Sequence, residues 1–393
     1  MPQTAPSAFD NEMMRIALRM ARRGLGTTSP NPAVGAVIAN EGTGEIIARG
    51  WTQPGGRPHA EPVAIAQAGV RARGMTMYVT LEPCSHHGKT PPCSDAVIAA
   101  GLQRVVVALT DPDPRVSGRG LEQLRRAGIE VVRGVCSEEA HWLTRGHIVR
   151  ITERRPFVQL KIAVGADGAV PRGSAGAPVF VTGAEARAHG HLLRAEADAI
   201  LVGHGTVRDD DPELTCRLPG LAARSPIRVV LSSSAGALDG TKLLASARQA
   251  PVHLVTADAV KAGDASALDR LREAGVIVHT VRCVGGRIWL PSMLETLASI
   301  GVTRLLVEGG PSVWTAFARH GLFDEVVLFH AWPNGTQGVD EDTARRSLGA
   351  LIGLDNLSLA AHRRLAGDDM LVFRQRLGQR VRAGIPATLD SQR

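Results

Sequence analysis

One histidine, two cysteines and one glutamate in the first quarter of the chain have the types and spacing of a catalytic zinc site. His59-Ala60-Glu61 is followed by Pro83-Cys84 and later by Cys93. Zinc binds imidazole nitrogen and thiolate sulfur, and a catalytic site uses three protein ligands and leaves the fourth place to water. We therefore expect His59, Cys84 and Cys93 to hold a catalytic zinc ion, with Glu61 free to move protons.

The order H-x-E, then P-C, then a later cysteine is the signature of zinc deaminases. The usual P-C-x-x-C half is lengthened here, because residues 85–92 separate the two cysteines. His59 and Cys93 each stand at the start of a predicted helix, where the helix dipole favours a thiolate. A structural zinc site would need a fourth ligand, such as His86 or His87. Ordinary buried cysteines are the other alternative, but the glutamate and the proline favour the deaminase pattern.

Length and composition indicate a soluble two-domain protein. The chain has 393 residues and a formal net charge of +7, which suits phosphorylated small molecules as well as nucleic acid. Five cysteines without a disulfide framework fit a reducing cytoplasm. We expect no signal peptide, no membrane span and a cytoplasmic location.

The first half alternates strands and helices, which predicts an α/β sandwich with the zinc helices on one face of a sheet. Expected strands cover residues 34–39, 75–80, 104–109 and 130–133; expected helices cover residues 9–23, 121–127 and 142–153. Asp10 is the expected N-cap of the first helix. The pattern breaks at Arg154-Arg155-Pro156, so we place a domain boundary near residue 150 and a first domain at 1–150.

The second half predicts another α/β domain, at 151–378, with a basic polar tail at 379–393. Its expected strands form a largely parallel sheet and cover residues 157–162, 199–202, 228–231, 252–256, 276–280, 304–307 and 325–329. Ligands are expected at the carboxyl ends of such strands. Two glycine-rich junctions, at residues 203–206 and 308–312, would let backbone N–H groups approach a phosphate. Neither is G-x-G-x-x-G, and tight turns explain them equally well.

Together these motifs resemble the bifunctional deaminase and reductase family of riboflavin biosynthesis over nearly the whole chain. The matching segments include residues 31–35, 59–61, 80–93 and 111–120 in the first half, and residues 160–161, 193–195, 205–217 and 308–311 in the second. The resemblance implies a cytidine-deaminase-like three-layer sandwich followed by a dihydrofolate-reductase-like α/β domain. It also suggests a homodimer or larger homo-oligomer.

The resemblance implies two successive reactions on a small phosphorylated pyrimidine. The first domain would use a zinc-activated water to deaminate 2,5-diamino-6-ribosylamino-4(3H)-pyrimidinone 5′-phosphate. The second would use NADPH to reduce the ribosyl group, giving 5-amino-6-ribitylamino-uracil 5′-phosphate. Neither nucleic acid nor a membrane is expected as a partner.

The resemblance also implies roles for individual residues. Glu61 and Lys161 would be catalytic. The substrate would contact Asn31, His86, Lys89 and Thr90 in the first domain, with Lys89 near the phosphate, and Arg194, Leu214, Arg217 and Glu308 in the second. NADPH would contact Ala163, Phe180, Thr206, Asp210, Gly310, Pro311 and Ser312. Each has a structural alternative: Leu214 and Ala163 could be plain core, and Arg194 a helix surface charge.

The second half departs from the family pattern at several positions. Gly165, Ala169 and Pro178 stand where a serine, a basic residue and a substrate-facing serine are usual, and residues 332–338 are altered. A monofunctional deaminase with a degenerate reductase domain is therefore one alternative. A tRNA or other nucleic-acid base deaminase is another, but one Tyr and seven Phe offer few stacking aromatics. A purely structural zinc protein is the third.

Overall fold

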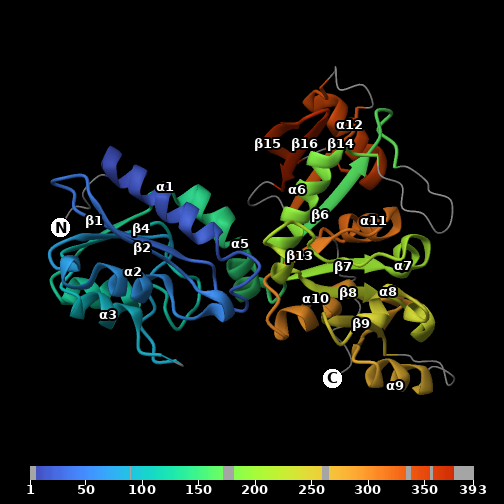
Figure 1. The fold of residues 1–393 in the computed structure, drawn as a ribbon, viewed down its shortest axis with the longest axis horizontal. Helices are drawn as coiled ribbons and strands as arrows, with labels where there is room; N and C mark the ends of the chain where they lie inside the picture. Colours follow the sequence, from blue (N-terminus) through green and yellow to red (C-terminus); the bar gives the residue numbers. More distant parts are fainter. Residues whose placement is uncertain are drawn as a thin grey trace, which may run out of the picture. The chain divides into compact units, whose positions relative to one another are not determined.

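The chain forms two compact units, each built on its own sheet (Figure 1). The computed structural model describes residues 6–88, 90–170, 181–258, 265–332, 338–354 and 357–375. The first unit comprises Met1–Pro156 with Gly301–Thr303, and the second comprises Phe157–Ile300 with Arg304–Arg393. The boundary expected near residue 150 falls inside helix α5 (Ser137–Glu153), and the division follows Pro156. The expected tail at 379–393 lies outside the described residues.

The sheet of the first unit has the strand order β2-β1-β3-β4-β5. Its strands are β1 (Gly35–Ala39), β2 (Ile46–Trp51), β3 (Thr76–Val79), β4 (Arg104–Val107) and β5 (Glu130–Arg133). β1 is antiparallel to both β2 and β3, whereas β3, β4 and β5 are parallel. The four predicted strands are confirmed, and β2 was not predicted.

Helices cover both faces of this sheet, so the unit is a three-layer sandwich. Helix α1 (Ala8–Arg22) and α5 pack on one face, around Met14 and Tyr78. The other face carries α2 (Ala60–Ala68), α3 (Cys93–Ala99) and α4 (Arg119–Arg126). Gly50 lets α2 lie directly on β2, because a Cβ there would sit 2.3 Å from the Ala60 carbonyl oxygen.

The N-cap of α1 is Ser7, not Asp10 as expected. The Ser7 hydroxyl accepts the Asp10 N–H at 3.0 Å, and the Asp10 carboxylate accepts the Ser7 N–H at 2.8 Å. This capping box places Asp10 in the first turn of the helix. There its buried carboxylate also pairs with Arg104 of β4 at 2.7 Å, which ties α1 to the sheet.

The second unit contains a nine-stranded sheet of order β10-β9-β8-β7-β13-β6-β14-β16-β15. Its strands are β6 (Phe157–Val164), β7 (Ala199–Gly203), β8 (Ile227–Leu231), β9 (Val252–Ala257), β10 (Ile277–Val281), β13 (Arg304–Val307), β14 (Glu325–His330), β15 (Ser358–Leu365) and β16 (Asp368–Arg374). The seven strands from β10 to β14 in this order are parallel, and β16 and β15 add an antiparallel edge. The largely parallel sheet is confirmed; β15 and β16 were not predicted.

Helices connect these strands, in keeping with parallel crossovers. They are α6 (Ala184–Ala195), α7 (His204–Asp210), α8 (Lys242–Ala245), α9 (Ala265–Glu273), α10 (Leu290–Ser299), α11 (Pro311–Arg319) and α12 (Glu341–Ile352). A small hairpin, β11 (Cys283–Val284) with β12 (Arg287–Ile288), stands apart from the main sheet. In the described parts of the chain, no helix is long and apolar enough to cross a membrane.

The buried carboxylate of Glu82 joins the ends of β3 and β4 to the start of α4. It accepts backbone N–H groups from Asp111 at 3.3 Å, Gly118 at 2.9 Å, Gly120 at 3.0 Å and Leu121 at 3.3 Å. Free N–H groups at a helix start need acceptors, and one carboxylate provides them here. The segment after β4 is therefore held by Glu82, which stands two residues before Cys84 in the chain.

Replacing Glu82 with alanine should destabilise the first unit. Four buried N–H groups would lose their acceptor, at about 3 kcal/mol in total, which corresponds to a fall of roughly 5–10 °C in the thermal midpoint of a unit this size. Calorimetric scans of Glu82→Ala and of the control Glu122→Ala, an exposed carboxylate of α4, measure the difference. Equal midpoints for the two variants would contradict this role.

Candidate functional sites

The predicted zinc ligands meet at one point of the first unit. His59 Nδ1, Cys84 Sγ and Cys93 Sγ all lie within 4.8 Å of one another. The histidine nitrogen is 3.3 Å from Cys93 Sγ and 3.7 Å from Cys84 Sγ. His59 is the N-cap of α2 and Cys93 is the first residue of α3, so two helix starts bring the ligands together as predicted.

The two sulfurs are close enough to share one proton. A hydrogen bond from Cys93 is the main cause that lowers the pKa of the Cys84 thiol to about 4, and the thiolate at Cys84 raises the pKa of Cys93. A cation between the two sulfurs would replace this proton. One nitrogen and two sulfurs leave a fourth place open, so this donor set fits a catalytic zinc ion.

Glu61 is the buried acid–base group beside these ligands. Its side chain is 3% exposed, and burial raises the pKa of its carboxyl group to about 7. It lies in the first turn of α2, two residues after His59. A carboxyl group in this position can exchange protons with a bound molecule.

A cavity of about 410 Å³ opens beside the cluster and is lined by His59, Glu61 and Cys84. Of the residues expected to contact substrate, Asn31 and His86 also line it. Asn31 Nδ2 donates to the Gly56 carbonyl at 2.8 Å, and His86 Nδ1 is buried with no partner among the described residues. Thr90 is exposed in the same loop, and Lys89 lies outside the described residues.

Four further polar residues of the cavity wall were not predicted. His147 of α5 donates from Nε2 to Asp111 Oδ1 at 3.1 Å, and the same oxygen accepts the Asp113 N–H at 2.9 Å. The Asp113 carboxylate binds the Arg115 guanidinium at 2.6–3.1 Å. That pair lowers the pKa of Asp113 to about 2. This wall is therefore polar but internally paired.

In the second unit, the sheet register brings Lys161 and Glu308 together. β6 and β13 are neighbouring parallel strands in which Leu160 pairs with Val307, so Lys161 in the middle of β6 lies beside Glu308, which follows the last residue of β13. Lys161 Nζ is 3.8 Å from Glu308 Oε2. Arg194 grips both oxygens of Glu308, from Nε at 2.8 Å and Nη2 at 2.9 Å. Arg194 is thus a largely covered partner of Glu308, with 15% of its side chain exposed, and not a helix surface charge.

Burial alone would raise the pKa of Glu308, but the charges of Arg194 and Lys161 prevail and lower it to about 2. Glu308 is therefore an anion at every ordinary pH. It can fix the position of Lys161 or accept hydrogen bonds from a ligand hydroxyl group.

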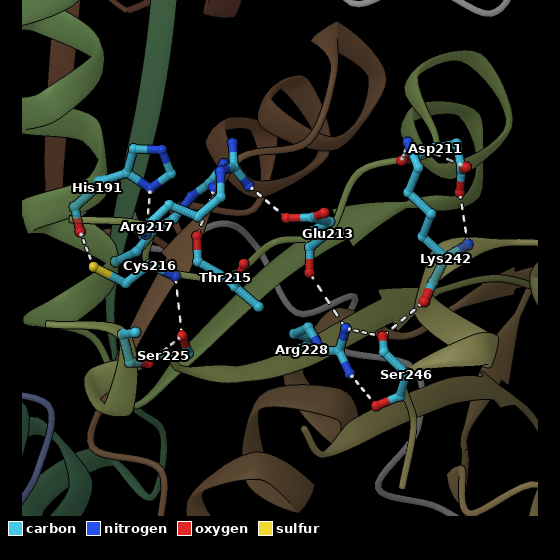
Figure 2. Close-up of polar contacts among 12 residues, drawn as sticks. His191, Asp211, Glu213, Thr215, Cys216, Arg217, Ser225, Arg228, Lys242 and Ser246 are labelled. Carbon is cyan, nitrogen blue, oxygen red and sulfur yellow. Dashed lines mark hydrogen bonds and ion pairs between the residues drawn. The ribbon is translucent and has the colours of Figure 1, made fainter. Parts of the chain in front are cut away.

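The segment from Asp211 to Arg217 is anchored to its surroundings by polar contacts (Figure 2). Arg194 Nη1 donates to the Thr215 carbonyl at 3.0 Å, and the Arg217 N–H donates to His191 Nδ1 at 3.3 Å. Buried Arg228 donates to the Glu213 carbonyl at 3.3 Å and to Ser246 Oγ at 2.8 Å.

Leu214 and Arg217 face different surroundings in this segment. Leu214 has a φ of +58° and a side chain only 2% exposed in the hydrophobic core. Arg217 is exposed and pairs with Glu213 at 3.1 Å. The contacts of the segment leave the Arg217 guanidinium accessible, while the side chain of Leu214 serves packing.

The residues expected to bind NADPH follow three neighbouring parallel strands. Ala163 lies at the end of β6, Thr206 and Asp210 lie in α7 after β7, and Gly310 is the N-cap of α11 after β13. The glycine junction at 203–206 thus opens a short helix. Pro311 and Ser312 are exposed in the first turn of α11, where free N–H groups suit a phosphate. Phe180 lies outside the described residues.

Comparison with known proteins identifies both halves of the chain. Residues 7–109 match the family described as the cytidine and deoxycytidylate deaminase zinc-binding region, and residues 156–332 match the RibD C-terminal domain. The riboflavin biosynthesis protein RibD of Aquifex aeolicus is 41% identical over 323 residues, covering 82% of this chain and 87% of that protein. The chain belongs to the RibD family.

Other family members agree over similar lengths. RibD of Escherichia coli is 39% identical over 82% of this chain and 87% of its own length. A structure of Acinetobacter baumannii RibD superposes with a TM-score of 0.76 at 32% identity, and covers 94% of this chain and 99% of that one. The Thermotoga maritima diaminohydroxyphosphoribosylaminopyrimidine deaminase/5-amino-6-(5-phosphoribosylamino)uracil reductase also gives 0.76, at 33% identity with the same coverage. This chain is therefore a riboflavin biosynthesis enzyme that combines a deaminase domain and a reductase domain.

Part of the departure from the RibD pattern lies in a tight turn after β6. The Gly165 N–H donates to the Ala169 carbonyl, and the Gly168 N–H donates to the Gly165 carbonyl, both at 2.9 Å. Asp167 closes the turn by accepting the Ala169 N–H at 3.0 Å. Pro178 and residues 333–337 lie outside the described residues. The changes at Gly165 and Ala169 are thus compatible with an ordered turn.

Loss of one sulfur should release the metal from this RibD family member. Cys93→Ser should lower bound zinc from about one ion per chain to less than about 0.1, because two protein ligands hold zinc poorly. Elemental analysis after dialysis measures the metal. Cys136→Ser, which changes a cysteine that hydrogen-bonds to Asn11, should retain zinc. Equal zinc in both variants would refute the assignment of Cys93.

The Glu308–Arg194 pair should make stability depend on acid pH. The native pKa of Glu308 near 2 lies below its ordinary 4.5, so its contribution is present above pH 5 and fades as pH falls toward 2. The stability difference between wild type and Glu308→Gln should shrink by about 2 kcal/mol from pH 6 to pH 3, as measured by urea unfolding. Glu213→Gln, an exposed counterpart, should show no such trend; a constant difference for Glu308→Gln would contradict the pairing.

Proposed function

We propose that the first unit deaminates the phosphorylated diaminopyrimidine named by the family resemblance, and that the second reduces its ribosyl group with NADPH. The observation that carries the first step is the convergence of His59, Cys84 and Cys93 within 4.8 Å, beside buried Glu61 and an open cavity. The deaminase named for the Thermotoga relative acts on the same class of compound.

In the first step, His59, Cys84 and Cys93 would hold zinc, which lowers the pKa of a coordinated water to about 7. Glu61 would hold the proton removed from the attacking water and deliver it to the ring nitrogen and then to the leaving ammonia. Asn31 and His86 would orient the ring from the cavity wall, as their position there supports.

In the second step, NADPH would supply a hydride to the anomeric carbon of the ribosyl group, and the bond from this carbon to the ring oxygen would break as the ring opens. Lys161 would donate a proton to the released ring oxygen, because its ammonium group lies beside the carboxyl end of β13 and is held by Glu308. Arg194 would act by fixing Glu308, and Arg217 would use its exposed guanidinium to contact the substrate. The residues after β6, β7 and β13 would bind the cofactor.

Two alternatives from other functional classes are tested by the same preparation. In a monofunctional deaminase, the second unit would show no affinity for NADPH. A nucleic-acid base deaminase would bind and deaminate tRNA at physiological salt. Among its described residues, the paired polar wall of the cavity has no Phe, Tyr or Trp on which a base could stack, which favours the small-molecule substrate. A cytoplasmic location and a homo-oligomer remain predictions.

Measuring both steps on wild type and on Glu61→Gln tests the activities of the two units separately. Wild type should release ammonia from the diaminopyrimidinone phosphate and oxidise NADPH with that compound and with its deaminated product. Glu61→Gln should lose at least about 100-fold in ammonia release, since it lacks the general acid–base group. It should still oxidise NADPH with the deaminated product and retain zinc.

Glu122→Gln changes an exposed carboxylate of the same unit and should behave as wild type. Ammonia release without NADPH oxidation by wild type would instead identify a monofunctional deaminase. Full activity in Glu61→Gln would identify the zinc as structural.

A further inference from the structure

Arg57 is an unpaired cation in the wall of the deaminase cavity. It stands two residues before His59 and lines the same cavity as His59, Glu61 and Cys84. In the part of the chain that the structure describes, no carboxylate forms an ion pair with it. Its contact is a hydrogen bond from Nη1 to Thr90 Oγ1 at 2.5 Å. A half-buried guanidinium without a counter-ion is available to an anionic ligand.

Apart from the acid–base group Glu61, the other acidic groups and the second arginine of the wall already have partners. Arg115 also lines the cavity, but its guanidinium is gripped by both oxygens of Asp113. Asp111 accepts a hydrogen bond from His147, and Glu82 accepts four backbone N–H groups. Arg57 is therefore the arginine of this wall that pairs with no carboxylate of the described residues.

The position of Arg57 links it to the loop between the two thiolates. Besides the bond to Thr90, its Nη2 lies beside Gly88, where an added Cβ would be 3.5 Å away. One of its five N–H donors is used by Thr90, and the others remain for a ligand. The hydrogen bond fixes the guanidinium in advance, which lowers the entropy lost when a ligand binds.

We propose that Arg57 binds the phosphate of the deaminase substrate and so makes this site specific for a phosphorylated nucleotide-like pyrimidine. This inference rests on the proposed function. A guanidinium binds a phosphate through charge-assisted hydrogen bonds, and loss of such bonds should weaken binding by about 10- to 100-fold. Among the described residues, Arg57 contacts Thr90 and lies beside Gly88, and it forms no hydrogen bond with a zinc ligand, so the effect should fall on KM.

The test compares the diaminopyrimidinone ribosyl phosphate with the same compound lacking its phosphate. Arg57→Gln should raise KM for the phosphorylated compound by about 10- to 100-fold, with kcat and bound zinc unchanged. For the compound without phosphate, KM should change by less than about twofold. Arg57→Lys should recover part of the preference. Arg71→Gln, which removes an exposed arginine paired with Glu45, should leave both values unchanged.

Several outcomes would overturn the inference. An equal rise in KM for both compounds would show that Arg57 positions the loop or His59 and does not bind the phosphate. The same preference in Arg57→Gln as in wild type would also refute it, as would loss of the preference in Arg115→Gln alone. If Arg57→Gln loses zinc, KM for the same two compounds is compared in Arg57→Lys instead. Failure of wild type on both compounds would instead refute the proposed deaminase reaction.

Discussion

The deaminase site depends on the contact between the Glu82 carboxylate and the start of α4. Four backbone N–H groups converge on one buried anion, so the ends of β3 and β4 cannot separate without leaving these groups unsatisfied. Gly120 strengthens the constraint, because a Cβ there would lie 2.1 Å from the Pro83 carbonyl oxygen. Cys84 follows directly, and its carbonyl accepts the Ser94 N–H of α3 at 3.1 Å. One carboxylate thus positions a metal ligand and the polar wall that carries Asp111.

In the second unit, the functional side chains are positioned by strand register and not by a carboxylate at a helix start. Parallel pairing of β6, β13 and β7 brings their carboxyl ends to one edge, where Lys161 and Glu308 become neighbours. The bidentate bond from Arg194 then holds Glu308 in a single orientation. Both units therefore rely on a buried carboxylate, but Glu82 meets backbone donors and Glu308 meets charged side chains.

The zinc ligands and most of the strands could be predicted because their signals are local. His59 and Cys93 stand at helix starts, and the buried strands are short apolar runs. β2 lacks such a run, since Arg49 and Gly50 interrupt it, and the exposed residues His362, Arg363 and Arg364 interrupt β15. α7 has only seven residues and was interpreted as a glycine turn. His147 could not be found, because a single histidine in a helix carries no sign of the distant aspartate that it meets. In the sequence, Arg57 is marked only by its charge and by its position two residues before the metal ligand His59.

The bond between Arg57 and Thr90 ties the two chain segments that contribute the metal ligands. The loop at residues 85–92 lies between Cys84, which the Glu82 contacts position, and Cys93, the first residue of α3, so its interior can vary without moving either sulfur. Closing a longer loop is entropically inexpensive, about 0.6 kcal/mol for each doubling of length. Changes in the length of this loop therefore offer evolution a way to reshape the entrance of the cavity while the metal chemistry is conserved.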